Sequence, residues 1–135
     1  MDNCKPILHV DDDEIDAMVV KKAVRILEMP NKLIYKTDGE EALNYLAGED
    51  NEKPCVILLD INMPRMNGRE FLQIVRNDPN LNKIPVIIVA ASDKDRDLIG
   101  SNVIGYVAKS LGFDDFVAFL KNEFEKLNSY SNLRS

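Results

Sequence analysis

Polar and charged side chains follow four apolar segments of the sequence, at the points where each segment ends. They occupy residues 11–14, 60–62, 90–92 and 109–110. Carboxylates brought within a few ångströms of one another repel strongly in a partly dry site, and a hard divalent cation relieves that repulsion with oxygen ligands. Mg²⁺ typically binds one or two carboxylates, retained waters and a phosphate group, so the pattern favours a magnesium pocket that handles a phosphoryl group.

Asp60 is the residue of this pattern whose functional role is best supported. It directly follows the unbroken apolar run of residues 55–59, which predicts a strand covered on both faces. An unpaired carboxylate at the rim of such a strand is costly, which favours a function. Asp13 and Glu14 have a simpler interpretation, because acidic residues stabilise the positive end of a helix. Lys109 gains significance only from the opposing acids, since its ammonium could bind a phosphoryl oxygen or pair with the carboxylates.

The elements that must position these residues follow from the hydrophobic periodicity. Short apolar runs predict strands at residues 7–10, 33–36, 55–59, 85–90 and 103–108. Helical spacing and capping residues predict helices at residues 15–27, 38–48, 68–78 and 113–127, with room for at most about two turns of a further helix at 93–102. Five strands alternating with five helices predict a doubly wound α/β fold with a parallel sheet. The four polar segments should then converge at the carboxyl edge of that sheet.

The first helix is expected to bury one apolar face against the sheet. The members of this face share helical spacing and are Ile15, Met18, Val19, Ala23, Ile26 and Leu27. Residues 128–135 lack such a pattern and are expected to fray. We therefore predict one domain over residues 1–128 and a C-terminal tail over residues 129–135.

Length and composition bound the class of protein. The chain has 135 residues, is 45% hydrophobic and carries a formal net charge of −6. These values fit one globular domain and exclude a disordered or disulfide-dense chain. The absence of a basic cluster argues against nucleic-acid binding, and the apolar runs are far shorter than the roughly 20 residues that cross a bilayer. The first residues do not resemble a signal peptide, so we expect a cytoplasmic protein.

Three segments together resemble the receiver domain of bacterial two-component response regulators, of the stand-alone type. Residues 7–13 read Ile-Leu-His-Val-Asp-Asp-Asp, residues 56–68 read Val-Ile-Leu-Leu-Asp-Ile-Asn-Met-Pro-Arg-Met-Asn-Gly, and residues 105–109 read Gly-Tyr-Val-Ala-Lys. The resemblance covers nearly the whole chain. It implies a CheY-like, flavodoxin-like fold of five βα units with strand order 2-1-3-4-5.

The resemblance also implies a role for each residue of the site. Asp60 would be the phosphoacceptor, and it would hold Mg²⁺ together with Asp11, Asp12 and the backbone carbonyl of Asn62. Lys109 would contact the phosphoryl group. The donor would be a phosphohistidine of a sensor histidine kinase or of a histidine phosphotransfer protein. Such a domain assists its own phosphorylation and dephosphorylation but is not otherwise an enzyme, and it signals by binding a downstream protein, as a monomer or weak homodimer.

Two positions depart from the family pattern. Ala90 stands where the family has the Thr or Ser hydroxyl that links the phosphoryl group to the switch aromatic, here Tyr106, and Ser92 is displaced by two residues. A hydrogen bond to a charged group contributes roughly 1.5–3 kcal/mol, comparable to the bias that moves a two-state switch tenfold. We therefore expect Asp60 to be phosphorylated while Tyr106 responds weakly. Ser110 stands where the family usually has a Pro joined to the Lys by a cis peptide. A cis bond before Ser is costly, so we expect one here only if contacts in the pocket require it.

Two other functions remain open from the sequence. A pseudo-receiver would keep the fold and bind partners without phosphorylation-dependent switching, and Ala90 is the main support for it. A small phosphatase would also use an Asp nucleophile and Mg²⁺, but such enzymes carry a second acid two residues after the nucleophile. Asn62 occupies that place here.

Overall fold

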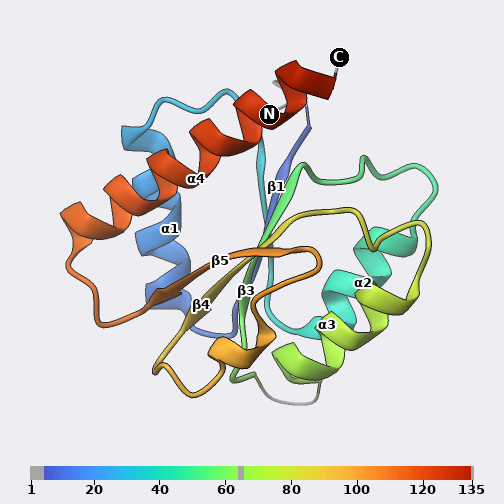
Figure 1. The fold of residues 1–135 in the computed structure, drawn as a ribbon. Coiled ribbons are helices and arrows are strands. Elements are labelled where there is room, and N and C mark those ends of the chain that lie inside the picture. The colour runs from blue at the N-terminus through green and yellow to red at the C-terminus, as the bar shows by residue number, and fades with distance from the viewer. Residues whose placement is uncertain (1–4, 64–65, 135) are drawn as a thin grey trace.

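A five-stranded parallel sheet forms the centre of the molecule (Figure 1). The structure is a computed structural model that describes residues 5–63 and 66–134. The strand order is β2-β1-β3-β4-β5, which confirms the expected topology. The strands are β1 (Ile7–Val10), β2 (Leu33–Lys36), β3 (Val56–Asp60), β4 (Val86–Ala90) and β5 (Val103–Ala108).

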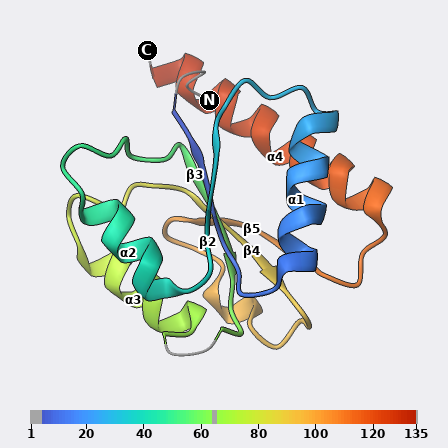
Figure 2. The ribbon, with the colours of Figure 1, turned by 180° about the vertical axis from the view of Figure 1, so that it is seen from behind.

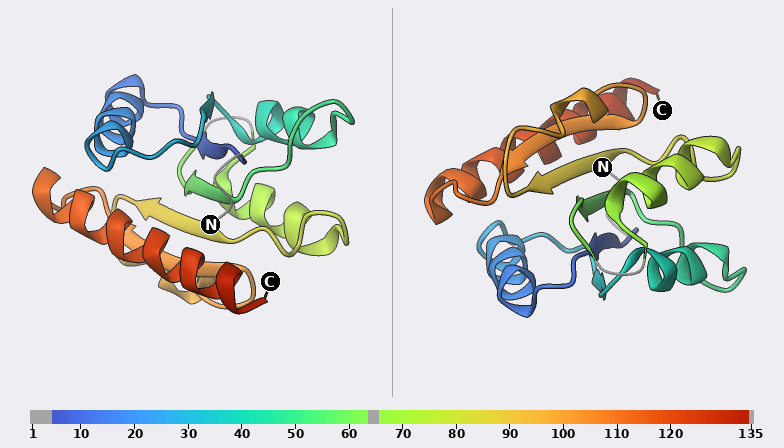
Figure 3. Two further views of the ribbon diagram at one scale, coloured as in Figure 1. Left: turned by 90° about the horizontal axis from the view of Figure 1, so that it is seen from above. Right: turned by 90° about the horizontal axis from the view of Figure 1, so that it is seen from below.

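Helices cover both faces of this sheet. They are α1 (Glu14–Ile26), α2 (Gly39–Ala47), α3 (Gly68–Asn77) and α4 (Phe113–Arg134). Helices α1 and α4 pack together on one face, and α2 and α3 pack together on the other (Figures 2 and 3). This arrangement confirms the doubly wound α/β class. No helix in the described part of the chain is long and apolar enough to cross a membrane.

The core consists of two apolar layers separated by the sheet. Successive side chains of a strand point to opposite faces, so Leu59 packs in the layer under α2 and α3 while Leu58 packs in the layer under α1 and α4. All five residues of β3 are buried. The fully buried strand β3 therefore fixes the position of the residues that follow it.

The connection between β4 and β5 is as short as expected, whereas the C-terminal helix is longer than expected. Only one turn of 3₁₀ helix, η1 (Arg96–Leu98), lies between β4 and β5. Gly100 and Ser101 adopt left-handed backbone angles, with φ of 125° and 51°, and turn the chain into β5 before a longer helix can form. At the other end α4 continues to Arg134. The helix therefore extends beyond residue 127, where its apolar pattern ends, because the sequence after Gly112 contains no Gly or Pro to stop it.

Helix α1 buries only part of the predicted face: Ala23 is buried and Leu27 packs against the core as predicted, but the rest of the face is more exposed. Its buried residues are Val20, Ala23 and Val24, whereas Ile15 and Met18 are 71% and 70% exposed. The helix carries two apolar stripes, and periodicity alone does not say which one faces the sheet. The apolar stripe containing Ile15 and Met18 therefore lies on the surface.

Candidate functional site

Asp11, Asp12 and Asp60 meet at the carboxyl edge of the sheet. Val10 of β1 lies beside Leu59 of β3, so the carboxylates that follow these residues become neighbours. Each of the three side chains offers an oxygen within 4.8 Å of the other two. Asp11 and Asp60 are 0% and 1% exposed, and Asp12 is exposed. The structure thus brings together acids that are about fifty residues apart in the sequence.

Lys109 completes this cluster from the end of β5. Its backbone N–H donates to the carbonyl of Ala90 at 2.7 Å, which fixes the chain at the end of the strand. Its Nζ lies 3.3 Å from Asp60 Oδ1 and 3.5 Å from Asp11 Oδ2. A third carboxylate, that of Asp16 on α1, lies nearer still, at 2.6 Å. Asp16 has no distinguishing pattern in the sequence, because an acid in the first turn of a helix is ordinary.

The hydrogen bonds of the two buried carboxylates leave one oxygen of each unsatisfied. The Asp13 N–H donates to Asp11 Oδ1 at 2.9 Å, and the Asn62 N–H donates to Asp60 Oδ1 at 3.2 Å. Asp11 Oδ2 and Asp60 Oδ2 are buried and have no hydrogen-bond partner among the described residues. Buried carboxylate oxygens without donors are suitable ligands for a hard divalent cation. The residues present therefore fit such an ion.

The two buried carboxylates, Asp11 and Asp60, have pKa values shifted in opposite directions. Burial, reinforced by the negative charge of Asp11, raises the pKa of Asp60 to about 7, although Lys109 and the Asn62 N–H oppose the shift. Burial would also raise the pKa of Asp11, but its contacts with His9, with the Asp13 N–H and with Lys109 hold that pKa below its ordinary value. As the pH rises, Asp11 therefore loses its proton before Asp60 does.

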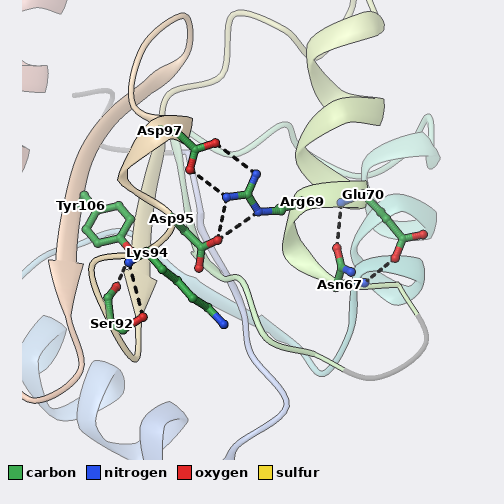
Figure 4. A network of polar contacts seen from close by, with 8 residues as sticks. All are labelled: Asn67, Arg69, Glu70, Ser92, Lys94, Asp95, Asp97 and Tyr106. Atoms are coloured by element: carbon green, nitrogen blue, oxygen red, sulfur yellow. Dashed lines mark hydrogen bonds and ion pairs between the residues drawn. The ribbon is translucent and has the colours of Figure 1, made fainter.

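The loop after Asp60 is held tightly against the start of α3. The Gly68 N–H donates to the carbonyl of Ile61 at 2.8 Å. A Cβ on Gly68 would lie only 2.5 Å from the Asp60 carbonyl oxygen, so glycine is required by this close approach. Asn67 caps the helix and forms a capping box with Glu70 (Figure 4). Local sequence thus fixes the backbone next to the acidic cluster.

Ala90 and Tyr106, the two expected switch positions, lie on neighbouring strands. Ala90 is the last residue of β4, is fully buried and offers no hydroxyl. Ser92 is exposed, and its hydroxyl accepts a hydrogen bond from the Lys94 N–H at 3.4 Å. Tyr106 is 7% exposed and donates its hydroxyl to the Ser92 carbonyl (Figure 4). The Tyr106 ring therefore packs in the core in this structure.

Arg69 ties the loop between β4 and β5 to α3. Its Nε and Nη2 lie 3.0 and 2.8 Å from Asp95 Oδ1, and Nη2 lies 2.8 Å from Asp97 Oδ1 (Figure 4). Asp95 is 4% exposed, so its charge is compensated mainly by this guanidinium. Arg96, between the two acids, places its guanidinium carbon 4.8 Å from the centre of the Tyr106 ring. The sequence shows no local sign of this network, which joins segments about 26 residues apart.

His9 and the peptide bond after Lys109 are two further features of the site. His9 of β1 is 1% exposed and places Nε2 3.5 Å from Asp11 Oδ2. It therefore lies directly beside the acidic cluster. The described residues contain no cis peptide bond, so Lys109 and Ser110 are joined by a trans peptide.

Comparison with known proteins agrees with this geometry. Residues 7–121 match the family described as response regulator receiver domain. The response regulator Rcp1 of Synechocystis sp. is 33% identical over 118 residues, which cover 82% of this chain and 80% of Rcp1. The crystal structure of the phosphorylated cyanobacterial phytochrome response regulator RcpA superposes with a TM-score of 0.80 at 32% identity, covering 93% of this chain and 95% of RcpA.

A second solved structure, the Mn(2+)-bound form of Rcp1, gives a TM-score of 0.75 at 32% identity and covers 87% of this chain and 90% of that one. The family match spans every strand and helices α1 to α3, and it contains all the residues of the acidic cluster and Lys109. The chain therefore belongs to the response regulator receiver domain family.

Proposed function

We propose that this receiver accepts a phosphoryl group on Asp60 from a phosphohistidine of a sensor histidine kinase or a histidine phosphotransfer protein. The observation that carries the proposal is the buried Asp60 carboxylate, with one unsatisfied oxygen, beside Asp11 and 3.3 Å from the Lys109 ammonium. An oxygen of Asp60 attacks the phosphorus in line and forms a P–O bond. The P–N bond of the phosphohistidine breaks, and its electron pair stays on the imidazole nitrogen.

The side chains around Asp60 supply position and charge for this transfer. Asp11, Asp12 and Asp60, with the backbone carbonyl of Asn62, would hold Mg²⁺, which when bound neutralises charge on the phosphoryl oxygens. Lys109 stabilises the negative charge of the transferred group from the opposite side. The Asn62 N–H orients the Asp60 carboxylate before the reaction. The solved structures of phosphorylated RcpA and of Mn(2+)-bound Rcp1 support this proposal by similarity.

The surface beside the acidic cluster supports a protein as the phosphoryl donor. Ile15, Met18 and Val19 share one face of α1 and are 71%, 70% and 36% exposed. Exposed apolar residues gathered on one face favour protein binding. This face begins at Ile15, three residues after Asp12, so a protein bound there would lie beside the acidic cluster. We propose that the receiver acts in the cytoplasm, as a monomer or weak homodimer, and signals through a downstream protein.

Intact-mass spectrometry tests the phosphoacceptor directly. The protein is incubated with acetyl phosphate and Mg²⁺, and an adduct of about 80 Da is expected on the wild-type chain. Asp60→Asn should abolish the adduct, whereas Asp50→Asn, which removes the same charge from an exposed loop, should not. No adduct from acetyl phosphate or from a histidine kinase would favour the pseudo-receiver. Rapid turnover of general phosphate esters would favour a phosphatase.

The pseudo-receiver is a second candidate because the residues expected to link Asp60 to Tyr106 lack a free hydroxyl. Ala90 provides no hydroxyl, the Ser92 hydroxyl is engaged by Lys94, and Tyr106 is already packed inward. We propose that phosphorylation of Asp60 produces a weak response at Tyr106. Under the pseudo-receiver alternative, partner binding would be the same before and after exposure to acetyl phosphate.

A further inference from the structure

Lys109 has three carboxylate partners among the described residues, and they are not equivalent. Asp11 and Asp60 belong to the group that could hold a metal ion, and Asp16 does not. Asp16 also makes the shortest contact, with its Oδ2 2.6 Å from Lys109 Nζ. The side chains of Lys109 and Asp16 are 24% and 26% exposed, so the pair lies at the rim of the pocket.

We propose that Asp16 is a positioning residue that keeps the Lys109 ammonium beside Asp60 when a divalent cation occupies the acidic cluster. The inference rests on the proposed phosphoacceptor function of Asp60. It adds a residue that the family pattern of acids and lysine did not identify, because Asp16 lies on α1 rather than at the end of a strand.

Electrostatics explains why such a residue is needed. A cation bound by Asp11 and Asp60 takes up their negative charge, and it repels the ammonium that these carboxylates otherwise hold. Asp16 keeps its full charge for Lys109. Its contact uses one of the three N–H donors of the ammonium, which leaves the others free for Asp60 or for a phosphoryl oxygen.

The position of Asp16 is itself fixed by α1. Its backbone N–H lies 3.4 Å from Asp13 Oδ1, the N-cap of the helix. Farther along the helix, Val20 and Ala23 are buried against the sheet. The carboxylate is therefore presented from a packed element rather than from a loop, which suits a group that must hold a long side chain in place.

The simpler interpretation is that Asp16 only stabilises the helix N-terminus, and Glu14 provides the matched control. Glu14 lies in the same first turn of α1, is exposed and is not among the described ion-pair partners of Lys109. Glu14→Gln and Asp16→Asn therefore remove the same charge from the same helix end. Only Asp16→Asn removes the contact with Lys109.

The first experiment observes the ammonium without requiring phosphorylation. Nitrogen NMR of ¹⁵N-labelled lysine side chains is recorded with and without saturating Mg²⁺, and Lys109→Met assigns the signal. In wild type and Glu14→Gln we expect the Lys109 ammonium signal to persist when Mg²⁺ is added, because a held ammonium exchanges slowly with water. In Asp16→Asn it should be lost with Mg²⁺. Persistence in Asp16→Asn would overturn the inference.

The second experiment measures the phosphorylation rate at saturating Mg²⁺ and acetyl phosphate. Asp16→Asn should slow the reaction roughly five- to tenfold, less than the full effect of a hydrogen bond between charged groups because this pair is partly exposed to water. Asp16→Glu should recover part of the rate, and Asp16→Asn should have no further effect in a Lys109→Met background. If the wild-type chain is phosphorylated but Asp16→Asn and Glu14→Gln react at equal rates, the positioning role is overturned and the phosphoacceptor function is not. A wild type that is never phosphorylated would overturn the function, while the NMR result still decides the positioning role.

Discussion

The Tyr106 hydroxyl donates a hydrogen bond to the backbone carbonyl of Ser92, and this bond joins the middle of β5 to the loop that follows β4. The Arg96 guanidinium lies over the same ring, with its carbon 4.8 Å from the ring centre. Neither contact involves the side chain of residue 90. The inward position of Tyr106 is therefore maintained by the loop itself, and a phosphoryl group on Asp60 has no hydroxyl at Ala90 through which to pull that loop.

Ala90→Thr should strengthen the response of Tyr106 to phosphorylation. The introduced hydroxyl could bond a phosphoryl oxygen and draw the loop inward, although the added atoms in a fully buried position should cost about 1–3 kcal/mol of stability. Tyrosine-ring NMR before and after acetyl phosphate treatment measures the response. We expect a small change in wild type and a larger one in Ala90→Thr, with Ala91→Thr as an exposed control. Equal changes in wild type and Ala90→Thr would contradict the damped switch.

Arg69→Gln should loosen the loop that carries Tyr106's partners. The substitution leaves the buried Asp95 without the guanidinium that it now shares with Asp97, and loss of such a partner costs about 1–3 kcal/mol. Hydrogen exchange of residues 95–99 should become faster, and urea unfolding should begin at a lower concentration. Lys94→Gln removes the same charge from an exposed side chain in that loop and should change neither measurement. Unchanged exchange in Arg69→Gln would show that the loop is held by other contacts.

The sequence predicted the parts of the site that depend on strand ends. Apolar runs end directly before Asp11, Asp60 and Lys109, and parallel strands bring such ends together whatever the details of packing. Asp16 and Arg69 could not be found in this way. Their partners lie on other elements, and an acid or an arginine in the first turn of a helix has no distinctive local pattern.

The buried face of α1 was predicted incorrectly in part for the same reason. Helix α1 carries two apolar stripes, and only packing against the sheet and α4 selects the stripe of Val20, Ala23 and Val24 over that of Ile15 and Met18. The first of these stripes forms the core, and the second is left on the surface. Periodicity established that the helix exists but left its rotation undetermined.

Asp60→Asn should stabilise the metal-free protein at alkaline pH. Burial and the charge of Asp11 raise the pKa of Asp60 from 3.8 to about 7, so the folded chain binds more protons than the unfolded chain between those values. The free energy of unfolding therefore falls as the pH rises through this window. Asp60→Asn lacks the charge and should be more stable than wild type at pH 8, by on the order of 2 kcal/mol.

Urea unfolding in EDTA at two pH values checks this linkage. The gap between Asp60→Asn and wild type should be large at about pH 8 and much smaller at about pH 5, where Asp60 is mostly protonated in the folded state. Asp50→Asn, in an exposed loop, should show no such dependence. A gap of the same size at both pH values would mean that the pKa of Asp60 is not raised.

Gly68→Ala should damage both stability and phosphorylation, because the Cβ would meet backbone rather than a flexible side chain. It would lie 2.5 Å from the Asp60 carbonyl oxygen and 2.5 Å from Ile61 Cα, so the segment that carries Asp60 must shift. We expect a loss of about 1–3 kcal/mol in urea unfolding and a slower appearance of the Asp60 adduct in intact-mass measurements. Gly112→Ala is the control, since the nearest atom to its Cβ would be at 3.9 Å, an ordinary contact. If Gly68→Ala matched Gly112→Ala in both measurements, the close approach of α3 to Asp60 would not be what positions the carboxylate.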